Sequence, residues 1–129
     1  MLAVDTNVVV RYLVNDDAAQ AARVRRLVER HDVLVPLTVL LESEWVLRGV
    51  YGLAAADVVR ALRAFAGLAR VTVENPAVAA AALDWAEQGL DFADALHLAA
   101  AQAQQGFVTF DKALARAARR LGAPPVREP

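Results

Sequence analysis

The stretch Leu2-Ala3-Val4-Asp5-Thr6-Asn7 joins a short apolar run to apolar positions at helical spacing in Val8–Leu13. The first three residues predict a short buried strand, and the spacing after Asp5 predicts a helix. Asp5 is therefore expected where a strand ends and a helix begins. In an open parallel sheet, ligands bind at this edge. Two alternatives follow for Asp5: it caps the helix N-terminus, or it binds a metal ion.

Length and composition narrow the class of protein. A chain of 129 residues, 57% of them apolar and many of them alanine, suits one helix-rich domain over residues 1–129. The absence of cysteine excludes disulfides and thiolate metal sites and agrees with a cytoplasmic location. No apolar stretch is long enough to span a membrane, and the first residues lack the basic segment of a signal peptide. The net charge of −1 argues against a globally basic nucleic-acid binder.

Strand patterns alternate with helix patterns along the whole chain. Strands are predicted at 2–4, 32–35, 71–73, 107–110 and 124–126, and helices at 7–14, 16–31, 37–50, 54–68, 76–88, 91–105 and 111–121. This alternation predicts an α/β fold with three layers, in which a short parallel sheet of four to five strands is flanked by about seven helices.

Two glutamates on the predicted helix 37–50 receive different interpretations. The positions one turn from Glu42 include Val39 and Val46, so Glu42 is predicted to face the core. A carboxylate there is costly unless it is paired or binds a cation. Glu44 precedes Arg48 by four residues, which predicts an ion pair on the surface. Glu42 is therefore the candidate functional acid of this helix.

Asp91 and Asp94 lie one turn apart at the start of another predicted helix. Asp91 is well placed as its N-cap, with Asp94 three residues later as in a capping box. Asp94 is followed on its own face by Leu98 and Ala101, so it is predicted to lie along an apolar stripe. His97 either pairs with Asp94 or packs against a neighbouring helix, and the structural role is favoured.

Asp111 repeats the arrangement of Asp5, because it follows the apolar run 107–110 and precedes a helix. Capping is again the alternative to a functional role. Two strands that end alike place two carboxylates at one sheet edge, where Glu42 and Asp94 can join them. Like charges at about 4 Å repel by several kcal/mol at a protein-like dielectric, which a divalent cation would relieve. All-oxygen ligands favour Mg²⁺ or Mn²⁺ over Zn²⁺.

Polar and basic residues near these acids suggest a phosphodiester substrate. Thr6, Asn7 and Thr109 supply neutral polar groups that can orient water around an ion. A carboxylate-held ion activates water and stabilises the charge of a phosphodiester transition state. Four basic residues fall on one predicted face of the last helix, where they either bind the phosphates of the substrate or form a solvated surface stripe: Lys112, Arg116, Arg119 and Arg120.

Four stretches match a known pattern in order and spacing: Ala3–Asn7, Leu41–Leu47, Asp91–Ala99 and Val108–Lys112. On these stretches nearly the whole chain resembles a PIN-domain protein, and more narrowly a VapC-type toxin ribonuclease of a type II toxin–antitoxin pair. The resemblance implies RNA cleavage that depends on Mg²⁺ or Mn²⁺, a homodimer, and a cognate antitoxin that blocks the site. It implies metal-site roles for Asp5, Glu42, Asp94 and Asp111, with Thr109 in support and Asp91 as a further acidic position.

We therefore predict a metal-dependent endoribonuclease. Asp5, Asp94 and Asp111 are expected to hold the ion, and Glu42 to complete its shell directly or through water. One alternative is a PIN-like scaffold that only binds RNA or a partner helix. Another is a nuclease acting on DNA, which the small size of the chain disfavours.

Overall fold

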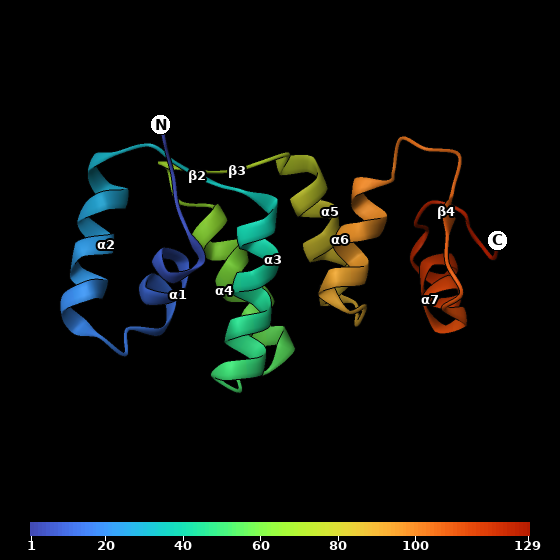
Figure 1. Cartoon of the computed structure of the whole chain (residues 1–129), viewed down its shortest axis with the longest axis horizontal. Helices are drawn as coiled ribbons and strands as arrows, with labels where there is room; N and C mark the ends of the chain where they lie inside the picture. Colours follow the sequence, from blue (N-terminus) through green and yellow to red (C-terminus); the bar gives the residue numbers. More distant parts are fainter. The chain divides into compact units, whose positions relative to one another are not determined.

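The computed structural model describes residues 1–129, which divide into two compact units, Met1–Pro76 and Ala77–Pro129 (Figure 1). Seven α-helices and five short strands form an α/β fold with parallel sheets, as the sequence predicts. The strands lie in one sheet of three and one of two, where a single sheet of four to five was expected.

The first unit contains three strands and four α-helices. They are β1 (Leu2–Ala3), α1 (Thr6–Val14), α2 (Ala18–Arg30), β2 (Val33–Val35), α3 (Leu37–Trp45), a π-helical turn η1 (Val46–Val50), α4 (Ala55–Ala66) and β3 (Val71–Val73). The strand order is β1-β2-β3, and both pairs are parallel, with Leu2 opposite Val33 and Val33 opposite Val71. The predicted helix 37–50 is thus α-helical only to Trp45 and continues as a π-helix.

Side-chain caps fix where the helices of this unit begin. Asp5 caps α1, which starts at Thr6, and Asp17 caps α2 by accepting a hydrogen bond from the Gln20 backbone N–H. Pro36 precedes α3 and has no capping side chain, so Glu74 Oε1 accepts from the Leu37 N–H at 2.9 Å instead. These bonds satisfy amide groups that a helix leaves unpaired at its start.

The core of the first unit forms where α1, α3 and α4 pack on one another. Its most buried side chains come from several elements, among them Val9, Val33, Leu47, Val58 and Leu62. Tyr12 of α1 packs edge-on against Phe65 of α4, with 5.1 Å between ring centroids. Burial of each such aliphatic side chain stabilises the fold by about 1.5–3 kcal/mol.

The second unit contains α5 (Pro76–Glu87, entering from the end of the first unit), α6 (Phe92–Ala100), β4 (Phe107–Val108), α7 (Lys112–Leu121) and β5 (Val126–Arg127). β4 and β5 are parallel, with Phe107 opposite Val126. Gly89 and Gly122 have φ of 104° and 69°, a region that glycine adopts without strain, and Gly122 ends α7 as predicted. Two predicted elements are shorter than expected: α6 ends at Ala100, and β4 ends at Val108.

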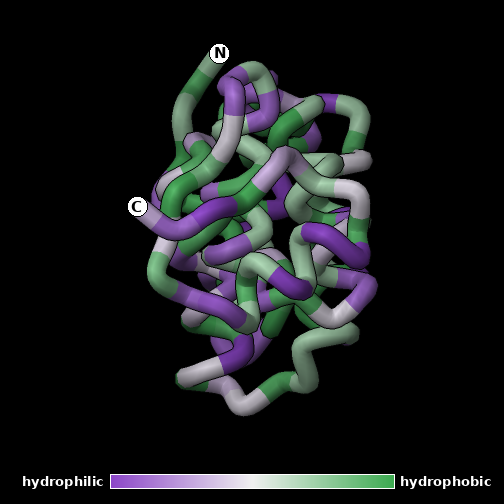
Figure 2. The backbone as a smooth tube through the Cα atoms, turned by 90° about the vertical axis from the view of Figure 1, so that its right-hand side faces the viewer, coloured by the Kyte–Doolittle hydropathy of each residue, from purple (hydrophilic) through white to green (hydrophobic).

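Hydrophobic and hydrophilic stretches alternate along the backbone (Figure 2). The clearest case is α7, which buries Leu114 and Ala118 while its basic residues stay exposed. This division is the pattern of an amphipathic surface helix. None of the helices combines the length and the apolar character that a membrane crossing requires.

Candidate functional site

Asp5 lies at the carboxyl end of β1 and caps α1, so the strand–Asp–helix junction forms as predicted, although Leu2 and Ala3 of β1 are exposed where a buried strand was expected. Asp5 Oδ1 accepts a hydrogen bond from the Thr6 backbone N–H at 2.8 Å. The carboxylate is exposed, and its second oxygen accepts no hydrogen bond from the protein. Capping therefore uses one oxygen and leaves the other open to a ligand.

Thr6 connects two of the predicted acids. Its backbone N–H binds Asp5, and its hydroxyl donates a short hydrogen bond of 2.5 Å to Glu42 Oε1 on α3. Thr6 is 5% exposed, so this contact forms at the edge of the core where α1 packs on α3. Glu42 Oε2, like Asp5 Oδ2, has no protein partner. The first unit thus holds two carboxylates that are linked through one residue, each with an open oxygen.

The predicted orientation of α3 is wrong. Glu42 is exposed, whereas Glu44 is buried, with 4% of its surface exposed. The buried face of α3 and η1 runs through Leu40, Ser43 and Leu47, one position away from the valine stripe used for the prediction. The larger leucines bury more apolar surface, so they decide which face turns inward.

The predicted ion pair of Glu44 with Arg48 does form, although it is not a surface pair. Arg48 Nε and Nη2 donate to the two Glu44 oxygens at 2.8 and 3.3 Å. The Glu44 side chain is 5% exposed, and that of Arg48 is 39% exposed. A buried carboxylate needs such a partner, so Glu44 already has a structural role.

In the second unit, Asp91 and Asp94 adopt the predicted capping arrangement. Asp91 is the N-cap of α6, and its Oδ2 accepts from the Asp94 backbone N–H at 3.2 Å. Asp91 is exposed and Asp94 is half-buried. Leu98, one turn after Asp94, is fully buried, so Asp94 does lie at the margin of an apolar face.

Electrostatics single out Asp94 among the acids. Burial raises its pKa above the ordinary value of 3.8, and the nearby charges of Asp91 and Asp111 raise it further, while His97 lowers it. Asp91 and Asp111 therefore both disfavour the charged form of Asp94, in addition to the effect of burial. A cation at this position would relieve that repulsion.

Asp111 follows β4 and caps α7, so the predicted strand–Asp–helix order occurs a second time, although its cap bond differs from that of Asp5. Its Oδ1 accepts from the Leu114 N–H at 3.0 Å, and its own N–H donates to Thr109 Oγ1 at 3.0 Å. Thr109 thus shapes the turn that presents Asp111 and has no hydrogen bond to any other acid. Asp111 is exposed, and one of its oxygens remains open.

The donors available suit a hard divalent cation. The open groups are carboxylate oxygens, which are the ligands that Mg²⁺ and Mn²⁺ prefer. Asp5 and Glu42 belong to the first unit, and Asp91, Asp94 and Asp111 to the second. In neither unit do three or more Asp, Glu or His side chains gather into a set that could hold a metal ion. Each unit by itself thus offers oxygen donors but no complete ligand set.

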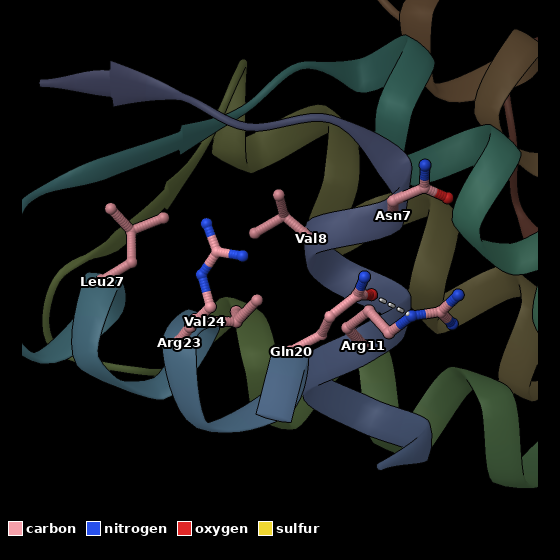
Figure 3. Close-up of a pocket in the computed structure, with 7 residues that line it drawn as sticks. All are labelled: Asn7, Val8, Arg11, Gln20, Arg23, Val24 and Leu27. Atoms are coloured by element: carbon pink, nitrogen blue, oxygen red, sulfur yellow. Dashed lines mark hydrogen bonds between the residues drawn. The ribbon is translucent and has the colours of Figure 1, made fainter. Parts of the chain in front are cut away.

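The remaining predicted residues, except Arg120, line two hollows. Asn7 lines a cavity of about 340 Å³ between α1 and α2, together with Val8, Arg11, Gln20, Arg23, Val24 and Leu27 (Figure 3). Arg11 Nε binds Gln20 Oε1 there at 2.8 Å. None of the candidate acids lines this cavity. Lys112, Arg116 and Arg119 line a second hollow, between α7 and β5, where Asp111 also lies, whereas Arg120 is exposed outside it.

Sequence reasoning missed three residues around these sites. Glu74 follows β3 and caps α3 from a distance of 37 residues in the chain, which no local pattern reveals. Arg127 lines the α7–β5 hollow because β5 pairs with β4. Phe110 was assigned to the strand, yet it is 81% exposed, because β4 ends two residues earlier. The Thr–Phe–Asp order before a helix was the available signal for a turn there.

Comparison with known proteins identifies the chain at the level of the family. A family model described as PIN domain matches residues 2–120, which is most of the chain. PIN domains are generally nucleases, and they typically use divalent metal ions. The comparison found no match among curated proteins and none among solved structures.

Proposed function

Because the chain belongs to the PIN-domain family, we propose that it is a metal-dependent endoribonuclease that hydrolyses RNA phosphodiester bonds. The observation that carries the proposal is the Thr6 contact, which holds Asp5 and Glu42 and leaves an open oxygen on each. An aspartate that only caps a helix, or an acid that is only solvated at the surface, does not require a second carboxylate linked to it through a shared hydrogen-bonding residue. Asp111, at the other strand–Asp–helix junction, and the crowded Asp94 support the same reading.

Each acid has a role in this proposal. Asp5, Asp94 and Asp111 would hold Mg²⁺ or Mn²⁺, with Asp91 as a further acidic residue of the proposed site. Glu42 completes the shell directly or through water, and it positions or deprotonates the water that attacks phosphorus. When bound, such an ion lowers the pKa of water and stabilises the charge on the phosphoryl oxygens.

The neutral groups act on the acids and on water. Thr6 fixes the Glu42 carboxylate through its hydroxyl, and Thr109 fixes the turn before Asp111. In this proposal Asn7, which is exposed at the start of α1, orients water or substrate. As the new P–O bond forms, the bond to the leaving sugar oxygen breaks, and that oxygen takes up a proton.

The biological role that we propose is that of a VapC-type toxin in a toxin–antitoxin pair. The support is the order and spacing of the four motifs that contain Asp5, Glu42, Asp94 and Asp111. The toxin acts in the cytoplasm as a homodimer, and a cognate antitoxin blocks its site. Growth arrest on expression of the chain, relieved by the product of a small neighbouring reading frame, is the expected result. No arrest with a soluble, folded chain would contradict the toxin role.

An RNA digestion assay tests the activity against its alternatives. The full chain is incubated with labelled single-stranded RNA, and separately with DNA of the same sequence, in Mn²⁺, Mg²⁺ or EDTA. The proposal expects cleavage of RNA that requires the metal and little cleavage of DNA. RNA binding without cleavage under every condition would favour a non-catalytic binding module, and preferential DNA cleavage would favour a DNA-directed nuclease.

A further inference from the structure

The hollow between α7 and β5 is strongly basic. It has a volume of about 300 Å³ and is lined by Asp111, Lys112, Ala115, Arg116, Arg119, Val126, Arg127 and Glu128. Its four basic side chains make no ion pair with any acid. Four unpaired cations against two acids leave the groove positively charged, although the chain as a whole carries −1. We call this feature the α7–β5 groove.

The sequence builds the groove through two separate constraints. Leu114 and Ala118 bury one face of α7, which turns the opposite face, from Lys112 to Arg119, toward solvent. That face spans about 10 Å at the helical rise of 1.5 Å per residue. Parallel pairing of β5 with β4, Val108 opposite Arg127, then brings Arg127 to the same groove. Arginine forks bind phosphate oxygens in a bidentate manner, so the groove suits a chain of phosphates.

Phe110 directly precedes Asp111, a residue that lines the groove, and its side chain is exposed to solvent. It is 81% exposed and makes no ring contact with another aromatic side chain. The residues on both sides of it are tied together, because the Asp111 N–H binds Thr109 Oγ1 and Asp111 caps α7. The turn is therefore set by its polar neighbours, and nothing in the core requires a phenyl ring at this position.

We propose that Phe110 and the α7–β5 groove form a binding track for single-stranded RNA. A base stacks on the Phe110 ring, and the neighbouring phosphates bind Lys112, Arg116, Arg119 and Arg127. A charged groove beside an exposed aromatic ring is the combination by which proteins bind single strands. A duplex keeps its bases stacked on one another and cannot offer a base face to Phe110. The proposal rests on the proposed function for the choice of RNA as the ligand.

Binding to the track would fix which nucleotide of the RNA lies next to Asp111. Phe110 precedes Asp111 directly in the chain, and Asp111 itself lines the groove. A base stacked on Phe110 would hold its own phosphate near that carboxylate. Phe110 is thus assigned as a positioning residue that selects unpaired nucleotides.

Binding without cleavage tests the track independently of catalysis. Fluorescence anisotropy of a labelled single-stranded RNA of about 12 nucleotides, within the size range of such sites, is measured with the full chain in EDTA. Phe110→Leu, which keeps an apolar side chain but removes the ring, is expected to weaken binding about tenfold, and Phe110→Trp to preserve it. An RNA duplex of the same sequence is expected to bind more weakly and to show no difference between Phe110→Leu and the wild type.

Charge removal tests the groove. The double variant Arg116→Ala/Arg119→Ala is expected to weaken binding and to reduce the slope of log Kd against log salt by about 1.4, since each phosphate contact contributes about 0.7 for a single strand. The matched control, Arg26→Ala/Arg30→Ala, removes two exposed arginines of α2 and is expected to leave both quantities nearly unchanged. Thermal melting confirms that each variant is folded.

The outcomes separate this proposal from the proposed function. If the chain cleaves RNA but Phe110→Leu and the arginine double variant bind as the wild type does, the track is wrong and the nuclease stands. If the variants weaken binding but no metal supports cleavage, the track stands and the nuclease is wrong. If Phe110→Asp dissociates a dimer while Phe110→Leu binds RNA normally, a second copy of the chain covers Phe110 and the proposal fails.

Discussion

The Thr6 hydroxyl donates a hydrogen bond of 2.5 Å to Glu42 Oε1 and so ties the start of α1 to α3. The two residues are 36 positions apart in the chain, and the neighbouring N–H of Thr6 binds Asp5. One threonine therefore controls the positions of two carboxylates at the carboxyl edge of β1. This contact leads to the first prediction.

Replacing Thr6 by valine removes the hydroxyl and keeps the shape of the side chain. Because a hydrogen bond to a charged group is lost at the edge of the core, the free energy of unfolding is expected to fall by about 1.5 kcal/mol. RNA cleavage with Mn²⁺ is expected to slow about tenfold, as Glu42 loses its fixed position. Thr38→Val, an exposed change on α3, is the control. If Thr6→Val cleaves RNA at the wild-type rate, the hydrogen bond from Thr6 to Glu42 has no role in cleavage.

Arg48 is predicted to matter for stability because it is the partner of the buried Glu44. Arg48→Met leaves that carboxylate without its bidentate donor and is expected to lower the free energy of unfolding by about 2 kcal/mol. Arg60→Met breaks the exposed pair with Asp57, and a loss below about 1 kcal/mol is expected. Urea denaturation of both variants measures the difference. Equal decreases in the free energy of unfolding would mean that burial of Glu44 does not increase the contribution of its ion pair to stability.

The pH dependence of stability is predicted to carry a signature of Asp94. Its pKa in the folded chain is raised by burial and by the charges of Asp91 and Asp111. An acid with a raised pKa favours the folded state below its unfolded value, here 3.8, and that contribution is lost as the pH rises through the folded pKa. In EDTA, Asp94→Asn is therefore expected to be more stable than the wild type at pH 7, with the difference shrinking toward pH 3.8.

Thermal melting from pH 3.5 to 7 measures this trend, with exposed Glu29→Gln as the control for removal of one acid. A wild-type chain that gains stability over Asp94→Asn as the pH rises would contradict the assigned crowding.

Metal ions are predicted to stabilise the folded chain. An ion that binds only the native state raises stability by about 2.7 kcal/mol at a concentration one hundred times its Kd. Mn²⁺ is expected to raise the Tm of the wild type, EDTA to reverse this, and Asp94→Asn to reduce the shift. NaCl at the same ionic strength controls for general charge screening. Identical shifts in the wild type and in Asp94→Asn would exclude Asp94 as a ligand.

Local patterns were enough to predict the order of elements and the helix starts. Apolar spacing located every strand and helix, and the caps at Asp5, Asp17, Asp91 and Asp111 formed because short acidic side chains satisfy unpaired amides. The predicted ends of strands were less accurate, because the end of a strand depends on how many of its residues pair with a neighbouring strand. β4 stops at Val108 because β5 pairs with only two of its residues, and this exposes Phe110.

Local sequence patterns could not decide which face of a helix is buried. α3 has apolar residues on more than one side, so its sequence permits burial of either Glu42 or Glu44. Packing against α1 and α4 selects the face of Leu40 and Leu47 and buries Glu44, which pairs with the partly exposed Arg48. The link from Thr6 to Glu42 and the cap from Glu74 to α3 are also contacts over long distances in the chain, which no periodicity encodes.

Asp5→Asn provides the most direct measurement of the central proposal, that the strand-end carboxylates hold a catalytic ion. Asparagine caps a helix about as well as aspartate, so the change removes a ligand charge and keeps α1 intact. Asp17→Asn makes the same change at the cap of α2. In Mn²⁺, Asp5→Asn is predicted to lose more than about 99% of RNA cleavage, near 3 kcal/mol of transition-state stabilisation, with an unchanged Tm in EDTA. Asp17→Asn is predicted to cleave at the wild-type rate. Wild-type cleavage by a folded Asp5→Asn would contradict the proposal.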